Sequence, residues 1–190
     1  MRIVALFAVL LLLNSCDSGT KTAEQAPEQR EEPRQPPASK LSQQGTEQLV
    51  VVLAKYYILK DALVASNEQE AAKAASELAT AADSFNRYVQ TIPETAMKTE
   101  LDTITGNAKL IAQAKGSVLQ RQRQAFEPIS NSMFRLLGKA ELRHAGVYQQ
   151  YCPMAFDNKG ANWLSNTEEI RNPYFGKKML ECGEVTDSLK

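Results

Sequence analysis

The fold class follows from the stretch at residues 46–66, which reads TEQLVVVLAKYYILKDALVAS. Its apolar residues recur at steps of three and four positions, at Leu49, Val52, Tyr56, Leu59 and Leu63. This spacing predicts one apolar stripe along an amphipathic helix, with Thr46 as the residue that caps its amino terminus.

Three further segments repeat this spacing. They cover residues 66–92, 97–116 and 117–138. The first and the last of them open with capping-box patterns, at Ser66 and Ser117. Pro128 lies inside the last segment, and we expect it to kink that helix or divide it.

The connections between these segments are short, which favours antiparallel neighbours. The sequence therefore predicts an all-α fold, with an up-down four-helix bundle at residues 46–144. The apolar stripes need no explanation beyond a packed core.

The chain changes character at residues 145–190, where the helical periodicity is lost. Six of the 13 aromatic residues fall there, with turn-forming Asn, Gly and Pro between them. We expect an irregular cap of the same domain, with room for one short hairpin, packed on the bundle. The residues expected to build this cap are Phe156, Trp163, Asn172, Pro173, Tyr174 and Phe175.

The amino terminus has the pattern of an export signal. Residues 3–13 form an apolar run of 11 residues after Arg2, which is too short for a membrane-spanning helix of about 20 residues. The motif Leu13-Asn14-Ser15-Cys16 then resembles the lipobox of bacterial lipoproteins. This resemblance implies a cleaved signal peptide at residues 1–15, and a diacylglyceryl thioether and an N-acyl chain on Cys16. Because several acyl chains anchor stably, we expect a lipid-anchored protein of the bacterial cell envelope, at the outer membrane or facing the periplasm.

Residues 16–45, the lipidated cysteine and the polar stretch after it, contain almost no aliphatic side chains. Such a composition cannot bury enough apolar surface to offset chain entropy. We expect a disordered tether between the lipid and the folded domain.

Charge and histidine content exclude several function classes. The 22 Lys and Arg residues balance 22 Asp and Glu residues, so the chain has no basic footprint for nucleic acid. The single histidine, His144, excludes His-rich zinc sites and allows at most one imidazole base. We therefore expect no catalytic residues, and a binding protein rather than an enzyme.

Two short clusters carry sulfur side chains, Cys152 with Met154 and Met179 with Cys182. Thiolate and thioether sulfur are the donors that favour Cu(I). If the clusters meet, these four residues form a closed site that holds or senses a soft metal ion, with Cu(I) as the expected cofactor. His144 is a further candidate ligand outside that site.

A disulfide between Cys152 and Cys182 would use the same sulfur atoms differently. An exported protein meets an oxidising compartment, and two cysteines remain once Cys16 is acylated. The domain would then be a non-catalytic scaffold or protein-interaction domain that the disulfide staples. Both hypotheses stay open at the level of the sequence.

The carboxy-terminal motifs resemble those of one protein family. Residues 151–156 (YCPMAF), 159–165 and 170–185 are similar to the signature of domain of unknown function 3347, and the resemblance covers about residues 49–185. The family consists mainly of exported bacterial proteins, and similar domains are attached to periplasmic adaptor proteins of heavy-metal efflux systems. The resemblance therefore implies heavy-metal handling, with efflux components as partners. Many relatives carry a His and Met pair between the second and third helices, which Met97 alone represents here.

Overall fold

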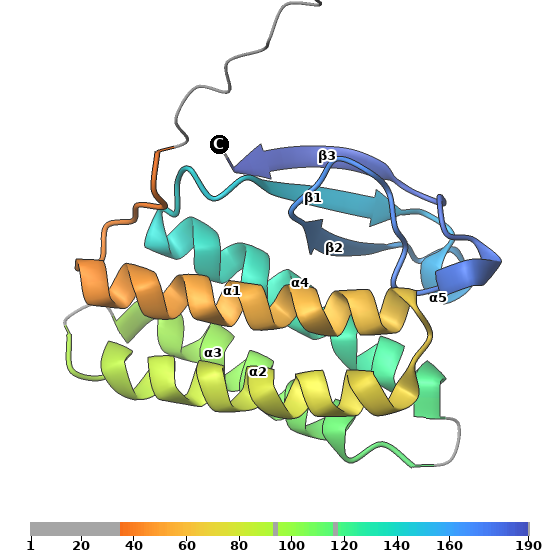
Figure 1. The fold of residues 1–190 in the computed structure, drawn as a ribbon, viewed down its shortest axis with the longest axis horizontal. Coiled ribbons are helices and arrows are strands. Elements are labelled where there is room, and N and C mark those ends of the chain that lie inside the picture. The colour runs from red at the N-terminus through yellow and green to blue at the C-terminus, as the bar shows by residue number, and fades with distance from the viewer. Residues whose placement is uncertain (1–34, 93–94, 116–117, 190) are drawn as a thin grey trace, which may run out of the picture. The chain divides into compact units, whose positions relative to one another are not determined.

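The computed structural model describes residues 35–92, 95–115 and 118–189. This part is mostly helical, with four long helices that pack in series along the chain (Figure 1). They are α1 (Gln43–Val64), α2 (Glu68–Val89), α3 (Lys98–Ala112) and α4 (Val118–Ala140), and a short 3₁₀ turn, η1 (Thr95–Met97), precedes α3. None of the helices in this part has the length and apolar character needed to cross a bilayer.

The folded domain begins before the end of the predicted tether, residues 16–45. Ala38 exchanges two backbone hydrogen bonds with Arg143, at N···O distances of 3.1 and 2.8 Å, and α1 begins at Gln43. The predicted end of the tether at residue 45 is therefore wrong. Ala38 and the first residues of α1 form backbone hydrogen bonds that composition does not reveal. The rest of the tether, the signal peptide and Cys16 lie outside the described residues.

The starts of α1 and α2 lie close to the predicted capping residues but do not coincide with them, and Ser117, the cap predicted for the fourth helix, lies outside the described residues. Ser42 caps α1, its Oγ accepting a hydrogen bond from the Gly45 N–H at 3.2 Å. The predicted cap, Thr46, lies one turn inside the helix, where its hydroxyl donates to the Ser42 carbonyl at 3.0 Å. Asn67 caps α2, one residue after the predicted Ser66. Because Ser, Thr and Asn can all cap a helix, residue chemistry alone does not choose between neighbouring candidates.

Helix α4 continues through Pro128 as one helix. Pro128 removes one backbone donor but does not divide the helix, so of the two expected outcomes, a kink or a division, the division is wrong. The apolar face around it is fully buried at Phe126, Ile129, Met133 and Leu136. Tertiary burial of this face therefore outweighs the lost hydrogen bond.

The all-α prediction is wrong for the carboxy-terminal region, which contains a three-stranded antiparallel sheet. Its strands are β1 (Val147–Cys152), β2 (Ala161–Ser165) and β3 (Glu184–Leu189), with the short turns α5 (Ala155–Asn158) and η2 (Gly176–Lys178) between them. The strand order is β2-β1-β3, and β3 pairs with β1 so that Tyr151 lies opposite Glu184. The sequence left room for one short hairpin, and β1 with β2 forms an antiparallel pair. The third strand, β3, is mostly exposed and lacks the alternation of a half-buried strand, so its sequence does not predict it.

The sheet packs against α4 through β2, as Figure 1 shows, with Trp163 and Leu164 buried. The Tyr56 hydroxyl of α1 accepts a hydrogen bond from the Leu164 N–H at 2.9 Å and lies 2.8 Å from the Ser130 hydroxyl of α4. Burial raises the pKa of Tyr56 far above its ordinary value, so its phenol stays neutral. One buried polar contact thus joins α1, α4 and β2.

Candidate functional site

The β1 and β3 pairing brings Cys152 and Cys182 together. Cys152 ends β1, and Cys182 lies two residues before β3. Both cysteines are free, and their Sγ atoms lie 2.7 Å apart. Cys152 is fully buried, whereas Cys182 is partly exposed. The two sulfur clusters predicted from the sequence therefore do meet, through their cysteines.

The 2.7 Å separation of the Sγ atoms lies between the geometries of a disulfide and of a shared metal ion. A disulfide bond is about 2.05 Å long, so these sulfurs are not joined by one. Metal–thiolate bonds of about 2.3 Å place two sulfurs on one tetrahedral ion roughly 3.8 Å apart. The pair must close by about 0.7 Å to form a disulfide, or open by about 1 Å to hold a metal.

The pKa of the Cys182 thiol is raised. A hydrogen bond with Cys152 and partial burial raise the pKa of Cys182 to about 11, against a weaker opposing effect of the Met154 backbone. At neutral pH this thiol is therefore protonated in the metal-free, reduced protein. A metal ion that binds here has to displace the proton, because the thiolate is the ligand.

The two predicted methionines lie beside the cysteine pair. Met154 follows β1 by two residues and is 47% exposed. Met179 lies in the turn that leads to Cys182, whose N–H donates to the Met179 carbonyl at 3.2 Å. Both methionines line a groove of about 940 Å³ between α4 and the turns of the cap. The structure thus brings all four sulfur residues to one end of the sheet.

A family model matches residues 52–144, from α1 to the turn after α4. Residues 52–144 match the model of the family described as protein of unknown function, DUF3347. This confirms the predicted family over residues 52–144, whereas the predicted resemblance reached residue 185. No curated protein and no solved structure matches the chain. The DUF3347 match ends before β1, so Cys152 and Cys182 lie outside the matched residues.

The other candidate ligands lie away from the cysteine pair. His144, at the end of the DUF3347 match, is exposed and precedes β1, whose six residues run about 16 Å from Val147 to Cys152. Met97 is buried in the helical core. In the part of the chain that the structure describes, no three His, Cys, Asp or Glu side chains form a cluster for a metal ion. Met154 and Met179 are therefore the candidate ligands that lie near the pair in the chain.

Asn172 holds Cys182 in place, a role that the sequence did not reveal. This buried amide donates through Nδ2 to the Cys182 carbonyl at 2.7 Å. Its Oδ1 accepts hydrogen bonds from the backbone N–H groups of Tyr174 at 2.8 Å and Phe175 at 3.2 Å. The side chain expected only to build the cap thus also positions one of the two thiols.

Arg123 ties the cap to the DUF3347 helices from inside the matched region. Its Nε donates to the Pro173 carbonyl at 2.8 Å, and its Nη2 donates to the Ser66 hydroxyl at 3.0 Å. Partial burial lowers the pKa of this guanidinium, which lines the same groove as the methionines. Arg123, which the sequence did not identify as a site residue, is therefore held by hydrogen bonds and forms part of the groove wall.

Three aromatic residues of the cap form one cluster with Phe126 of α4. Tyr174 lies at its centre, with ring centroids 6.0 Å from Trp163, 5.2 Å from Phe156 and 5.9 Å from Phe126. Trp163 and Tyr174 are buried, while Phe156 and Phe175 are partly buried against the core. The expected cap residues thus pack together beside the sulfur pair.

The turn α5, between β1 and β2, has an unusual backbone conformation. Phe156, Asp157 and Asn158 have φ values of 52°, 58° and 65°, in the left-handed region that L residues rarely enter. Gly160 follows at φ 78°, where a Cβ atom would lie 2.0 Å from the Tyr151 hydroxyl. Gly160, which lines the groove, therefore packs closely on the Tyr151 ring, and a side chain at this position would collide with that ring.

Proposed function

We propose that the domain binds a soft metal ion of the Cu(I) type through Cys152 and Cys182, with Met154 and Met179 as thioether ligands. The observation that supports this proposal is the contact of two free thiols, 2.7 Å apart, beside a groove that both methionines line. Thiolate and thioether sulfur are the donors that Cu(I) prefers. Such a site holds an ion or hands it on, and we assign it no catalytic role.

Cys182 is the ligand that has to move when a metal binds. Cys152 lies on β1 between two paired strands, whereas Cys182 lies in the turn before β3. Separation of the two sulfurs then requires a shift of the turn that Asn172 holds. Because Cys182 has a raised pKa, metal binding releases a proton and weakens at low pH.

The setting that we propose is a lipid-anchored domain of the bacterial envelope. The motif that ends in Cys16 supports the anchor, and the resemblance of the carboxy-terminal motifs is the reason that we propose heavy-metal handling with efflux components as partners. In this proposal the four helices form an up-down bundle that carries the cap. We expect Cys16→Ser to release the protein from the membrane fraction, and normal labelling of that variant by fatty acid would contradict the anchor.

A second candidate function is a non-catalytic scaffold stapled by a Cys152–Cys182 disulfide. The same short sulfur separation favours it, because closing the bond needs only a small movement. Full burial of Cys152 also suits a structural role. A thiol count on native protein from the envelope separates the two: two free thiols fit the metal site, and none before reduction fits the disulfide.

The direct test of the metal proposal is Cu(I) binding by the anaerobically reduced, full-length chain, in competition with a chromogenic chelator. We expect about one Cu(I) per chain, and roughly tenfold or greater weakening in the Met154→Leu, Met179→Leu variant, which keeps the apolar volume. Met97→Leu is the matched control and should bind normally. The proposal fails if the wild type binds no more Cu(I) than the Cys152→Ser, Cys182→Ser variant.

A further inference from the structure

Helix α1 exposes a regular row of residues along its outer side. The exposed positions step by three and four residues and are Gln44, Glu47, Val51, Ala54, Ile58 and Asp61. The centre of this row is apolar, with Val51 51% and Ile58 50% exposed. We call these six residues the α1 stripe.

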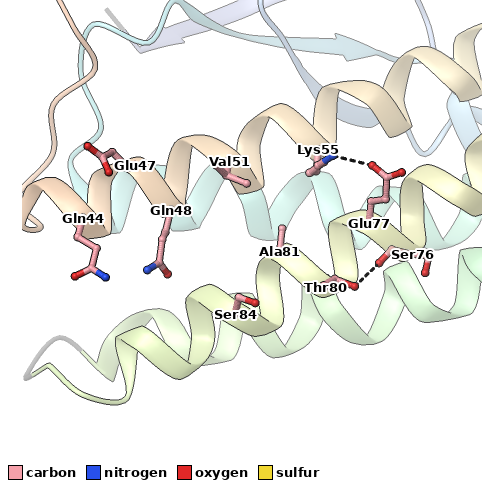
Figure 2. A pocket seen from close by; sticks show the side chains of 10 residues that line it. All are labelled: Gln44, Glu47, Gln48, Val51, Lys55, Ser76, Glu77, Thr80, Ala81 and Ser84. Atoms are coloured by element: carbon pink, nitrogen blue, oxygen red, sulfur yellow. Dashed lines mark hydrogen bonds and ion pairs between the residues drawn. The ribbon is translucent and has the colours of Figure 1, made fainter.

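A groove runs beside the α1 stripe, between α1 and α2. It has a volume of about 760 Å³, and Figure 2 shows Gln44, Gln48 and Val51 along its α1 wall and Ala81 and Ser84 along its α2 wall. A second hollow, of about 650 Å³, is also bordered by Val51. Val51 therefore lies between two depressions. Depressions of this kind can receive the side-chain ridges of another helix.

The spacing of the α1 stripe is that of a helix–helix seam. Steps of three and four residues match the a and d positions of a coiled coil, whose partner residues repeat in the same way. From Gln44 to Asp61 the stripe is about 26 Å long, enough for roughly five turns of a second helix. The geometry therefore favours a helical partner that lies along α1.

Charge excludes a second copy of this chain as the best partner. Glu47 and Asp61 each lie seven residues from Ala54, at the two ends of the apolar centre. Two copies of α1 would place acid against acid in either direction, Glu47 on Glu47 in parallel or Glu47 on Asp61 in antiparallel. Like charges in such positions disfavour association.

The positive charges near the α1 stripe are already engaged. Lys55 Nζ lies 2.7 Å from a Glu77 carboxylate oxygen in the groove, as Figure 2 shows. Lys60 is buried, with its ammonium 2.8 Å from Asp61, whose carboxylate keeps 61% exposure. Glu47 is exposed, and Asp61 keeps most of its carboxylate accessible although it pairs with Lys60, so both ends of the stripe suit a basic partner.

We propose that the α1 stripe docks one amphipathic helix of a partner protein, with an apolar centre flanked by Lys or Arg residues that meet Glu47 and Asp61. This inference does not rest on the proposed metal function, because it uses a different surface. Apolar contact with Val51 and Ile58 supplies affinity, and the acidic ends select the partner's charge.

The test measures fluorescence anisotropy of a synthetic amphipathic helix on the full-length chain. The probe has leucine at the central a and d positions, which face Val51 and Ile58, and lysine at the outer a and d positions, which face Glu47 and Asp61. A matched probe has glutamate in place of lysine. We expect the lysine probe to bind about tenfold or more tightly than the glutamate probe. Val51→Ser with Ile58→Ser should weaken its binding by about tenfold or more. Glu47→Lys with Asp61→Lys should reverse the preference between the probes.

Leu110→Ser on α3 is the matched control, because Leu110 is 62% exposed but lies outside the α1 stripe. It should change binding by less than about twofold. Three results would overturn the proposal: equal weakening by Leu110→Ser, a probe preference that the charge reversal leaves unchanged, or a wild-type dimer that Val51→Ser with Ile58→Ser converts to a monomer. The last result would identify a second copy as the occupant.

Discussion

Asn172 holds the backbone of Cys182 through its side chain without touching the thiol. Its amide bonds to the Cys182 carbonyl through Nδ2 and to two backbone N–H groups through Oδ1. Because the donor and the acceptor act on different segments, they can be tested separately.

Asn172→Asp keeps the acceptor and removes the donor to Cys182. We expect a loss of about 1 to 3 kcal/mol in the free energy of unfolding, and faster alkylation of Cys182 by iodoacetamide in the reduced protein. Asn107→Asp removes a similar bond, from Nδ2 to the Thr103 carbonyl on α3, and is the control for alkylation. An unchanged alkylation rate in Asn172→Asp would show that the amide does not position the thiol.

The raised pKa of Cys182 links the stability of the reduced protein to pH. The thiol has a pKa near 9 when unfolded and about 11 when folded, so the folded state keeps its proton longer. Stability is therefore fully present below pH 9 and falls as the pH rises to about 11. Urea unfolding at several pH values should show this fall in the wild type and lose it in Cys182→Ser. A parallel fall in both proteins would assign the effect to other groups.

At the scale of elements, the strained turn α5 depends on a close approach to β1. Gly160 lies over the Tyr151 ring, where no Cβ atom fits. Gly106, in the middle of α3, has nothing within 4 Å of the place where a Cβ would stand. The two glycines thus have opposite roles in their elements.

Gly160→Ala should destabilise the domain by about 1 to 3 kcal/mol, because the positive φ and the contact with Tyr151 both resist a side chain. Gly106→Ala should instead stabilise it by about 0.5 to 1 kcal/mol through better helix propensity. Denaturant unfolding of both variants checks the pair of signs. Equal effects of the two substitutions would mean that α5 is not held as the structure shows it.

At the scale of the whole molecule, the helices and the sheet depend on one another. Trp163, Leu164 and Tyr174 are buried within the same core cluster as Phe126 of α4. The DUF3347 match stops at residue 144 and leaves these residues out. We infer that the matched helices do not form a complete folding unit without the cap.

A chain that ends after His144 should lose cooperative unfolding, because it exposes the apolar face that the cap covers. A chain that ends after Gly183 loses only the mostly exposed β3 strand and is the matched control. It should keep a cooperative transition at a lower temperature. Thermal unfolding followed by near-ultraviolet circular dichroism distinguishes the two, and a cooperative transition in the shorter chain would make the cap a separate unit.

The sequence by itself determined the four helices, the family and the four sulfur residues. Apolar stripes such as that from Leu49 to Leu63 follow from the spacing of residues three and four positions apart. The preference of sulfur ligands for soft metal ions is a property of single Cys and Met side chains. The sequence did not determine which residue caps each helix, because Ser42 and Asn67 lie near other residues that can also act as caps.

Only the tertiary structure decided how these parts combine. The meeting of Cys152 with Cys182 requires β3 to pair with β1, and those strands are separated by a long stretch of chain. Likewise, Asn172 reaches Cys182, and Arg123 reaches Pro173, only after the cap has packed on α4. Such contacts depend on closing long loops over a buried core, and no local pattern of residues records them.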